Sequence, residues 1–146
     1  MSKPVILCVD DESVVLDSLK IQLKNAFQDA YGYELAESSE EAWDILEELS
    51  EDDTHVLVIV SDWLMPGMKG DEFLIKVHQK FPTVLKIMLT GQADMDAVKK
   101  AIERASLYRC LSKPWNSEEL IATIQSGLNN YQSSRNYEQT SGDLRR

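Results

Sequence analysis

Residues 55–62 read His-Val-Leu-Val-Ile-Val-Ser-Asp, an apolar run that ends abruptly in an acid. A run this short and this continuous is typical of a strand in a parallel sheet that is covered on both faces. Other short segments of the chain have the composition expected of strands. We therefore expect strands at residues 4–9, 33–36, 55–60, 84–89 and 107–111.

Segments with helical spacing separate these strands. Between residues 13 and 27 the apolar positions recur every three or four residues, as in an amphipathic helix. We expect Ser39 to cap the next helix, and Asn116 with Glu119 has the spacing of a capping box for the last one. Two more helices are expected at residues 71–81 and 93–105.

The alternation of strands and helices predicts the fold class. It creates βαβ units, whose right-handed crossovers produce a parallel sheet with helices on both faces. We therefore predict an α/β, doubly wound fold with five strands and five helices. A chain of 146 residues is about the length of one such domain.

Composition narrows the range of partners. The chain has 15 Lys and Arg against 25 Asp and Glu, a net charge of −10, which argues against direct binding to nucleic acid. No apolar stretch approaches the roughly 20 residues that span a bilayer, so we expect no membrane segment and a cytoplasmic location. Cys8 and Cys110 lie within apolar runs, and we interpret both as reduced core thiols.

Polar residues follow four of the expected strands. Asp10 and Asp11 follow the first, Asp62 the third, Thr90 the fourth and Lys113 the fifth. Because ligands of an open parallel sheet bind beyond the carboxyl ends of its strands, we expect these side chains to share one site. Three carboxylates brought together repel one another unless a metal ion or a lysine neutralises them.

The residue types at this edge indicate phosphoryl chemistry. Carboxylates with no His or Cys beside them suit Mg²⁺ better than Zn²⁺. Lys113 and the hydroxyl of Thr90 would favour a phosphoryl group, and a carboxylate could be its acceptor. The simpler alternatives are that Asp10 and Asp11 cap a helix, that Asp62 forms a turn and that Thr90 caps the helix after it.

Four motifs at these strand ends resemble those of the receiver domain of two-component response regulators, and the resemblance covers residues 4 to 130. It implies a flavodoxin-like strand order of 2-1-3-4-5. The motifs are Val9-Asp10-Asp11-Glu12, Ser61-Asp62-Trp63-Leu64-Met65-Pro66-Gly67-Met68-Lys69-Gly70, Met88-Leu89-Thr90-Gly91 and Ser112-Lys113-Pro114-Trp115.

The resemblance implies a role for each site residue. Asp62 would accept the phosphoryl group, and Asp11, Asp62 and the backbone carbonyl of Leu64 would hold Mg²⁺. Asp10 would act through metal-bound water. Lys113 would pair with the phosphoryl oxygens.

One position departs from the pattern of the receiver family. Thr90 would move toward the phosphoryl group, and in the family an aromatic residue three positions before the lysine changes rotamer with it. That position is Cys110 here. Tyr108, two residues earlier in the same strand, is the candidate substitute, and the sequence leaves this open.

The resemblance also suggests how the chain is organised. Residues 1–130 would form the receiver domain, and residues 131–146 a polar tail or linker leading to an output module outside this chain. The donor would be a sensor histidine kinase or a phosphotransfer protein. The output domain or protein would bind through the face formed by residues 93–130, and a phosphorylation-dependent dimer is compatible with this face.

Two other functions compete with a signalling switch. A Mg²⁺-dependent phosphohydrolase could use the same aspartyl-phosphate, but such enzymes need a second acid two residues after the nucleophile. Leu64 occupies that position. A phosphorylation-independent interaction module would not need the acidic cluster and lysine. We therefore expect a regulatory domain and not an enzyme.

Overall fold

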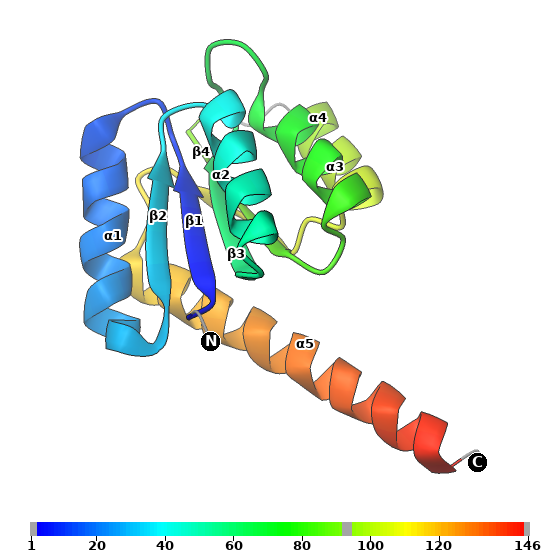
Figure 1. Ribbon diagram of the computed structural model, residues 1–146. Coiled ribbons are helices and arrows are strands. Elements are labelled where there is room, and N and C mark those ends of the chain that lie inside the picture. The colour runs from blue at the N-terminus through cyan, green and yellow to red at the C-terminus, as the bar shows by residue number, and fades with distance from the viewer. Residues whose placement is uncertain (1–2, 92–94, 145–146) are drawn as a thin grey trace.

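The chain forms one five-stranded parallel sheet with helices on both faces in the computed structural model, which describes residues 3–91 and 95–144, and side chains as far as residue 130 (Figure 1). The strand order is β2-β1-β3-β4-β5, which confirms the predicted doubly wound fold. The strands are β1 (Val5–Val9), β2 (Gly32–Ala36), β3 (Val56–Asp62), β4 (Leu85–Thr90) and β5 (Arg109–Ser112).

The helices divide between the two faces of the sheet. Two apolar cores result, one beneath α1 and α5 and the other beneath α2, α3 and α4. None of the helices in the described part of the chain is both long and apolar enough to cross a membrane. The helices are α1 (Ser13–Phe27), α2 (Ser39–Glu51), α3 (Gly70–Lys80), α4 (Met95–Ala105) and α5 (Ser117–Leu144), with a short 3₁₀ turn η1 (Gln28–Ala30).

Strand β3 lies between β1 and β4, and its last five residues are all buried. This burial is what the continuous apolar run at residues 55–60 predicts, because a central parallel strand is covered on both faces. In the sheet register Val9 pairs with Ser61, and Asp62 pairs with Leu89. The carboxyl ends of β1, β3 and β4 therefore meet at the same edge.

The cap of α2 differs by one residue from the prediction. Ser38, and not Ser39, is the cap: its Oγ accepts a hydrogen bond from the backbone N–H of Glu41 at 3.0 Å. Ser38 has the extended backbone of a cap, whereas Ser39 is already helical and buried. The Oγ of Ser39 donates to the carbonyl of Met68 at 2.9 Å and so links α2 to the loop before α3.

The last helix is longer than the composition suggests. Its cap is as predicted, with Asn116 Oδ1 accepting from the backbone N–H of Glu119 at 3.0 Å. However, α5 continues to Leu144 and so runs through residues 131–144, where we expect a polar tail or linker. Polar composition signals that a segment cannot build a core, but no Gly or Pro between Gly127 and Gly142 interrupts the backbone hydrogen bonds. At the start of α4, residues 93 and 94 lie outside the described part.

Strand β4 carries a buried lysine far from the sheet edge that holds the acids. Lys86 is 1% exposed. Its ammonium donates to the carbonyl of Val84 at 2.9 Å and contacts Nδ1 of His78 at 3.1 Å, and neither partner is a carboxylate. Burial lowers the pKa of Lys86 to about 8. The ammonium form is thus destabilised in the folded chain at neutral pH.

We expect Lys86→Met to raise the free energy of unfolding at pH 7 by about 1–2 kcal/mol, because it removes a buried charge and keeps the volume. The wild type should itself gain stability as pH rises from about 8 toward 10.5. Over that interval Lys86 is neutral in the folded chain but still protonated in the unfolded chain. The advantage of the variant should shrink over that interval. Urea unfolding at pH 7 and 9.5 measures both effects.

Lys24→Met is the control, because Lys24 is exposed on α1. It should change the free energy of unfolding by less than about 0.5 kcal/mol at either pH. A Lys86→Met variant that is less stable than wild type at pH 7 would show that the hydrogen bonds of Lys86 outweigh its burial.

Candidate functional site

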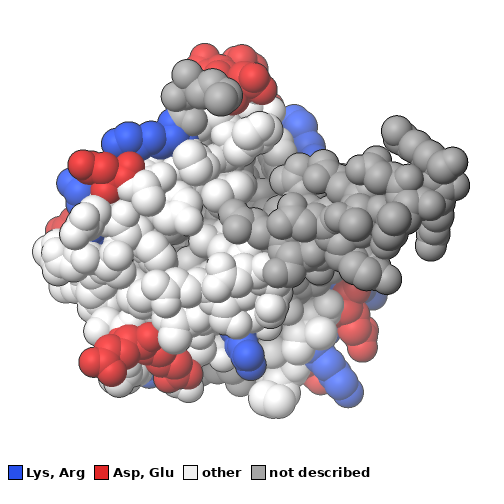
Figure 2. All heavy atoms as spheres, turned by 90° about the horizontal axis from the view of Figure 1, so that it is seen from below, with Lys and Arg blue, Asp and Glu red and all other residues white. Residues whose placement is uncertain are grey.

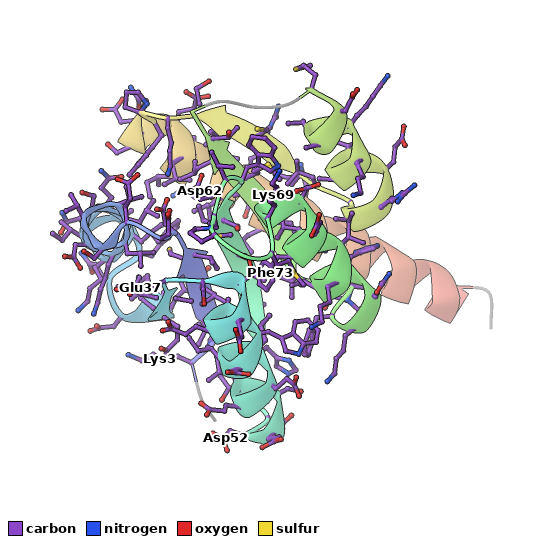
Figure 3. The ribbon with its side chains drawn as sticks, turned by 90° about the horizontal axis from the view of Figure 1, so that it is seen from above. Lys3, Glu37, Asp52, Asp62, Lys69 and Phe73 are labelled. Atoms are coloured by element: carbon purple, nitrogen blue, oxygen red, sulfur yellow. The ribbon has the colours of Figure 1, made fainter. Side chains whose placement is uncertain are left out.

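The carboxyl ends of the strands bring the predicted site residues together. Asp10 directly follows β1, Asp62 and Thr90 end β3 and β4, and Lys113 directly follows β5. Figure 3 looks down on this edge and shows Asp62 near its middle, with Lys69 on the adjoining loop. The site therefore lies where a doubly wound sheet binds its ligands.

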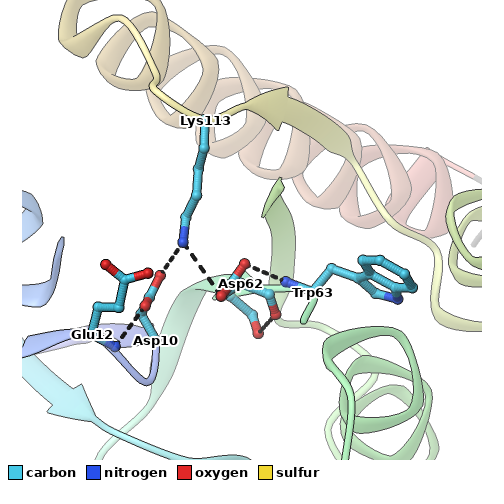
Figure 4. Close-up of polar contacts among 6 residues, drawn as sticks. Asp10, Glu12, Asp62, Trp63 and Lys113 are labelled. Carbon is cyan, nitrogen blue, oxygen red and sulfur yellow. Dashed lines mark hydrogen bonds and ion pairs between the residues drawn. The ribbon is translucent and has the colours of Figure 1, made fainter. Parts of the chain in front are cut away.

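Lys113 lies between two buried carboxylates (Figure 4). Its Nζ donates to Asp10 Oδ2 at 2.6 Å and lies 3.3 Å from Asp62 Oδ2. Asp10 and Asp62 are 1% and 7% exposed, so water screens this contact poorly. Lys113 thus supplies the neutralising charge that the three acids require.

Asp11 completes the acidic cluster. One carboxylate oxygen from each of Asp10, Asp11 and Asp62 lies within 4.8 Å of the other two. Asp10 accepts from the backbone N–H of Glu12 with Oδ1 and from Lys113 with Oδ2. Asp11 is exposed. Asp11 is therefore the carboxylate of this cluster that is best disposed to bind an ion directly.

The charges at this edge perturb one another. Burial raises the pKa of Asp62, and the carboxylate of Asp10 raises it further, while Lys113 acts in the opposite direction. Burial by itself would lower the pKa of Lys113. The hydrogen bond and charge of Asp10, together with Asp62, outweigh burial and raise that pKa. Lys113 is therefore a firmly protonated cation beside a carboxylate that a further positive charge would stabilise.

A cleft of about 530 Å³ opens above these residues. Thr90 is 5% exposed within it, and Leu64 is 51% exposed at its rim. Figure 2 shows the opposite end of the molecule, away from the cleft, where charged side chains lie mainly around the margin. The cleft is lined by Asp11, Glu12, Asp62, Leu64, Met65, Pro66, Thr90, Gly91 and Lys113.

Gly70 fixes the loop that borders the cleft, a role that the sequence pattern did not predict. Its backbone N–H donates to the carbonyl of Trp63 at 2.8 Å, which closes the loop onto the end of β3. A Cβ at this position would clash with the carbonyl oxygen of Asp62. Only glycine permits this approach.

Comparison with known proteins decides the family. The model of the response regulator receiver domain matches residues 6–125. The chain belongs to this family. Receiver domains are regulatory domains of two-component systems, where they work with histidine kinases and output domains, and they generally bind Mg²⁺ at an acidic pocket.

Curated relatives of this receiver domain are longer transcriptional regulators. The hydrogenase transcriptional regulatory protein HoxA of Cupriavidus necator is 30% identical over 123 residues, covering 84% of this chain and 24% of HoxA. The DNA-binding transcriptional regulator NtrC of Klebsiella pneumoniae is 29% identical over 132 residues, covering 90% of this chain and 26% of NtrC. The chain spans about a quarter of the length of these relatives.

Solved receiver domains share the fold. The receiver domain of an HD domain-containing protein from Pseudomonas fluorescens Pf-5 superposes with a TM-score of 0.79 at 31% identity, covering 90% of this chain and 98% of that one. A CheY-like receiver domain from Methanospirillum hungatei JF-1 gives a TM-score of 0.80 at 28% identity, covering 91% and 99%.

Tyr108 does not lie where the missing aromatic residue of a receiver domain is expected. Its hydroxyl is 3.1 Å from Ser126 Oγ on α5, and its backbone N–H donates to Lys86 of β4. Cys110 pairs with Met88 and packs against the core beneath α2, α3 and α4. In this conformation Tyr108 is therefore held at α5, away from Thr90.

We expect Asp62→Asn to raise the free energy of unfolding by about 1 kcal/mol at pH 7 without divalent ions, because it removes a carboxylate that burial and Asp10 destabilise. Because the pKa of Asp62 is raised in the folded chain, its ionised carboxylate lowers the free energy of unfolding. This loss of stability disappears as pH falls through that pKa and Asp62 becomes protonated. The gain should therefore shrink toward acidic pH. Chemical denaturation at pH 7 and pH 4 measures it.

Asp17→Asn removes an exposed acid of α1 and serves as the control. It should leave the free energy of unfolding within about 0.5 kcal/mol of wild type. Equal effects of Asp62→Asn and Asp17→Asn would contradict the proposed electrostatic strain at the cluster.

Proposed function

We propose that this receiver domain is a phosphorylation-activated switch that accepts a phosphoryl group on Asp62. The observation that carries the proposal is the contact of Lys113 with Asp62 at the floor of a cleft. An acceptor needs a carboxylate oxygen that a donor can reach, and a cation that stabilises the transferred charge. Asp62 and Lys113 fulfil these two requirements.

The acidic cluster fits Mg²⁺ as the cofactor. Asp11, Asp62 and the backbone carbonyl of Leu64 are the proposed protein ligands, and oxygen donors of this kind suit Mg²⁺. Asp10 would act through a metal-bound water, because it is almost completely buried and holds Lys113 at 2.6 Å, the shorter of the two contacts of that ammonium. When bound, the ion would neutralise negative charge on the phosphoryl oxygens.

Each residue then has a distinct part in the transfer. A carboxylate oxygen of Asp62 forms a bond to phosphorus as the bond from phosphorus to the donor's nitrogen breaks. Lys113 pairs with a phosphoryl oxygen and keeps its proton throughout, in keeping with its raised pKa. The hydroxyl of Thr90, at the end of β4, donates to another phosphoryl oxygen once the group is in place.

The donor and the output follow from this role. The donor is a sensor histidine kinase or phosphotransfer protein, and we assign the exchange to the cytoplasm, where ATP sustains such kinases. Residues 1–130 form the switch, and residues 131–146 lead to an output module. The output domain or protein binds through the face formed by residues 93–130, which could also mediate a phosphorylation-dependent dimer. The greater length of HoxA and NtrC supports the output module in this proposal.

Modification at Asp62 should require both the carboxylate and Mg²⁺. Wild type incubated with acetyl phosphate and Mg²⁺ should gain the mass of one phosphoryl group, and EDTA should abolish the gain. Asp62→Asn should remain unmodified, because an amide is a poor nucleophile. Intact-protein mass spectrometry provides the measurement, and equal modification of the two proteins would contradict the assignment.

Mg²⁺ binding should depend on Asp11. We expect Asp11→Asn to weaken Mg²⁺ affinity at least tenfold, because it removes a proposed ligand. Trp63 fluorescence can report the titration, since its backbone N–H donates to Asp62 Oδ1 at 2.8 Å. Asp17→Asn is the matched control and should bind Mg²⁺ as wild type does. Identical titrations of Asp11→Asn and wild type would refute this ligand set.

A further inference from the structure

Trp63 is bound at both ends by carboxylates. Its backbone N–H donates to Oδ1 of Asp62 at 2.8 Å, and its indole Nε1 donates to Oδ1 of Asp71 at 3.0 Å. Asp71 lies in the first turn of α3 and is 5% exposed. Trp63 therefore connects Asp62 to a buried carboxylate outside the cleft.

The same carboxylate contacts α4. The ammonium of Lys100 lies 3.8 Å from Oδ2 of Asp71, so the two oxygens of Asp71 serve two different elements. The Lys100 side chain is 39% exposed while that of Asp71 is 7% exposed. This pair is thus only partly screened by water, unlike an ion pair between two exposed side chains.

Helix α4 packs through small side chains, with Val98 partly buried against the same core. Its buried residues are Ala97, Ala101 and Ala105, whose small side chains each bury little apolar area. Met95 and Ile102, its large apolar residues, are 75% and 54% exposed. The ion pair of Lys100 with Asp71 therefore adds a polar contact to an α3–α4 packing that is otherwise made by small apolar side chains.

We propose that Asp71 is a positioning residue that links the phosphorylation site to α4, through its hydrogen bond to Trp63 and its ion pair with Lys100. The proposal rests on the proposed phosphorylation of Asp62. Phosphorylation adds charge and volume to the carboxylate that accepts from the Trp63 peptide, and the resulting shift of the indole changes how Asp71 holds Lys100. This route needs no aromatic residue at Cys110.

A simpler role for Asp71 would be to complement the dipole of α3. Acids in the first turn of a helix do so routinely, and Glu72 is a second acid there. Asp71 could complement the dipole without being buried and without a partner on each carboxylate oxygen. If that were its role, Lys100 would have no effect on how α4 responds to phosphorylation. The two roles therefore differ in what Lys100→Met should do.

The test follows the amides of residues 95–105 and the indole N–H of Trp63 by NMR, with and without Mg²⁺ and beryllofluoride, a phosphoryl mimic. In Lys100→Met and in Asp71→Asn the α4 shifts caused by beryllofluoride should fall at least threefold. The Trp63 indole should still respond in Asp71→Asn, because the amide side chain retains an oxygen that accepts from it. Lys100→Arg keeps the ion pair and should restore the response.

Lys99→Met removes the neighbouring lysine of α4 and should leave the response at the wild-type level. In the double variant Asp71→Asn with Lys100→Met, the α4 response to beryllofluoride should be no smaller than in either single variant, because both changes break the same contact. A full α4 response in Lys100→Met would overturn the link, and Lys100→Met decides this even if Asp71→Asn does not fold.

One readout does not depend on phosphorylation. Without beryllofluoride, Lys100→Met should already shift the indole N–H resonance of Trp63, because the ammonium polarises the carboxylate that accepts from it. An unshifted resonance would refute the link itself. A wild type that fails to respond to beryllofluoride while Lys100→Met shifts the indole would instead refute the proposed phosphorylation.

Discussion

The contact of Lys113 with Asp10 and Asp62 is the interaction on which the rest of the site depends. Two buried carboxylates repel each other strongly, and Asp11 adds a third at the surface. A single ammonium, 2.6 Å from one and 3.3 Å from the other, makes the cluster tolerable. The residual strain is still visible in the raised pKa of Asp62. Such strain suits a cation-binding site, because a bound divalent ion would relieve it.

The fold holds these charges in place through its backbone. Parallel pairing of β3 with both β1 and β4 brings Asp10, Asp62 and Thr90 to one edge, and β5 adds Lys113. The loop after β3 closes tightly because Gly70 has no side chain to strike the Asp62 carbonyl. Asp62 is the last residue of β3, and Asp10 and Asp11 directly follow β1, so the pairing of these strands sets where the acids lie. Placement of this kind favours binding of a small, strongly hydrated ion.

Signalling also requires a part of the molecule that can change. The large apolar residues of α1 and α3 make firm contacts with the sheet, whereas α4 buries alanines. A helix that buries little apolar area can shift between two positions at a small free-energy difference. With Cys110 in place of an aromatic residue and Tyr108 bound to α5, the polar path that we propose through Trp63 and Asp71 is one contact that joins the site to this helix.

Local patterns in the sequence determined the fold class and the members of the acidic site. Apolar runs at helical or continuous spacing, each followed by a polar residue at a strand end, carry that information without any long-range contact. Other features were decided only by tertiary structure. The contact of Ser39 with Met68, the close approach at Gly70 and the shared carboxylate of Asp71 depend on which backbone or side chain lies opposite. Asp71 reads as an ordinary acid at a helix start because its partners, Trp63 and Lys100, meet only once α3 and α4 pack together.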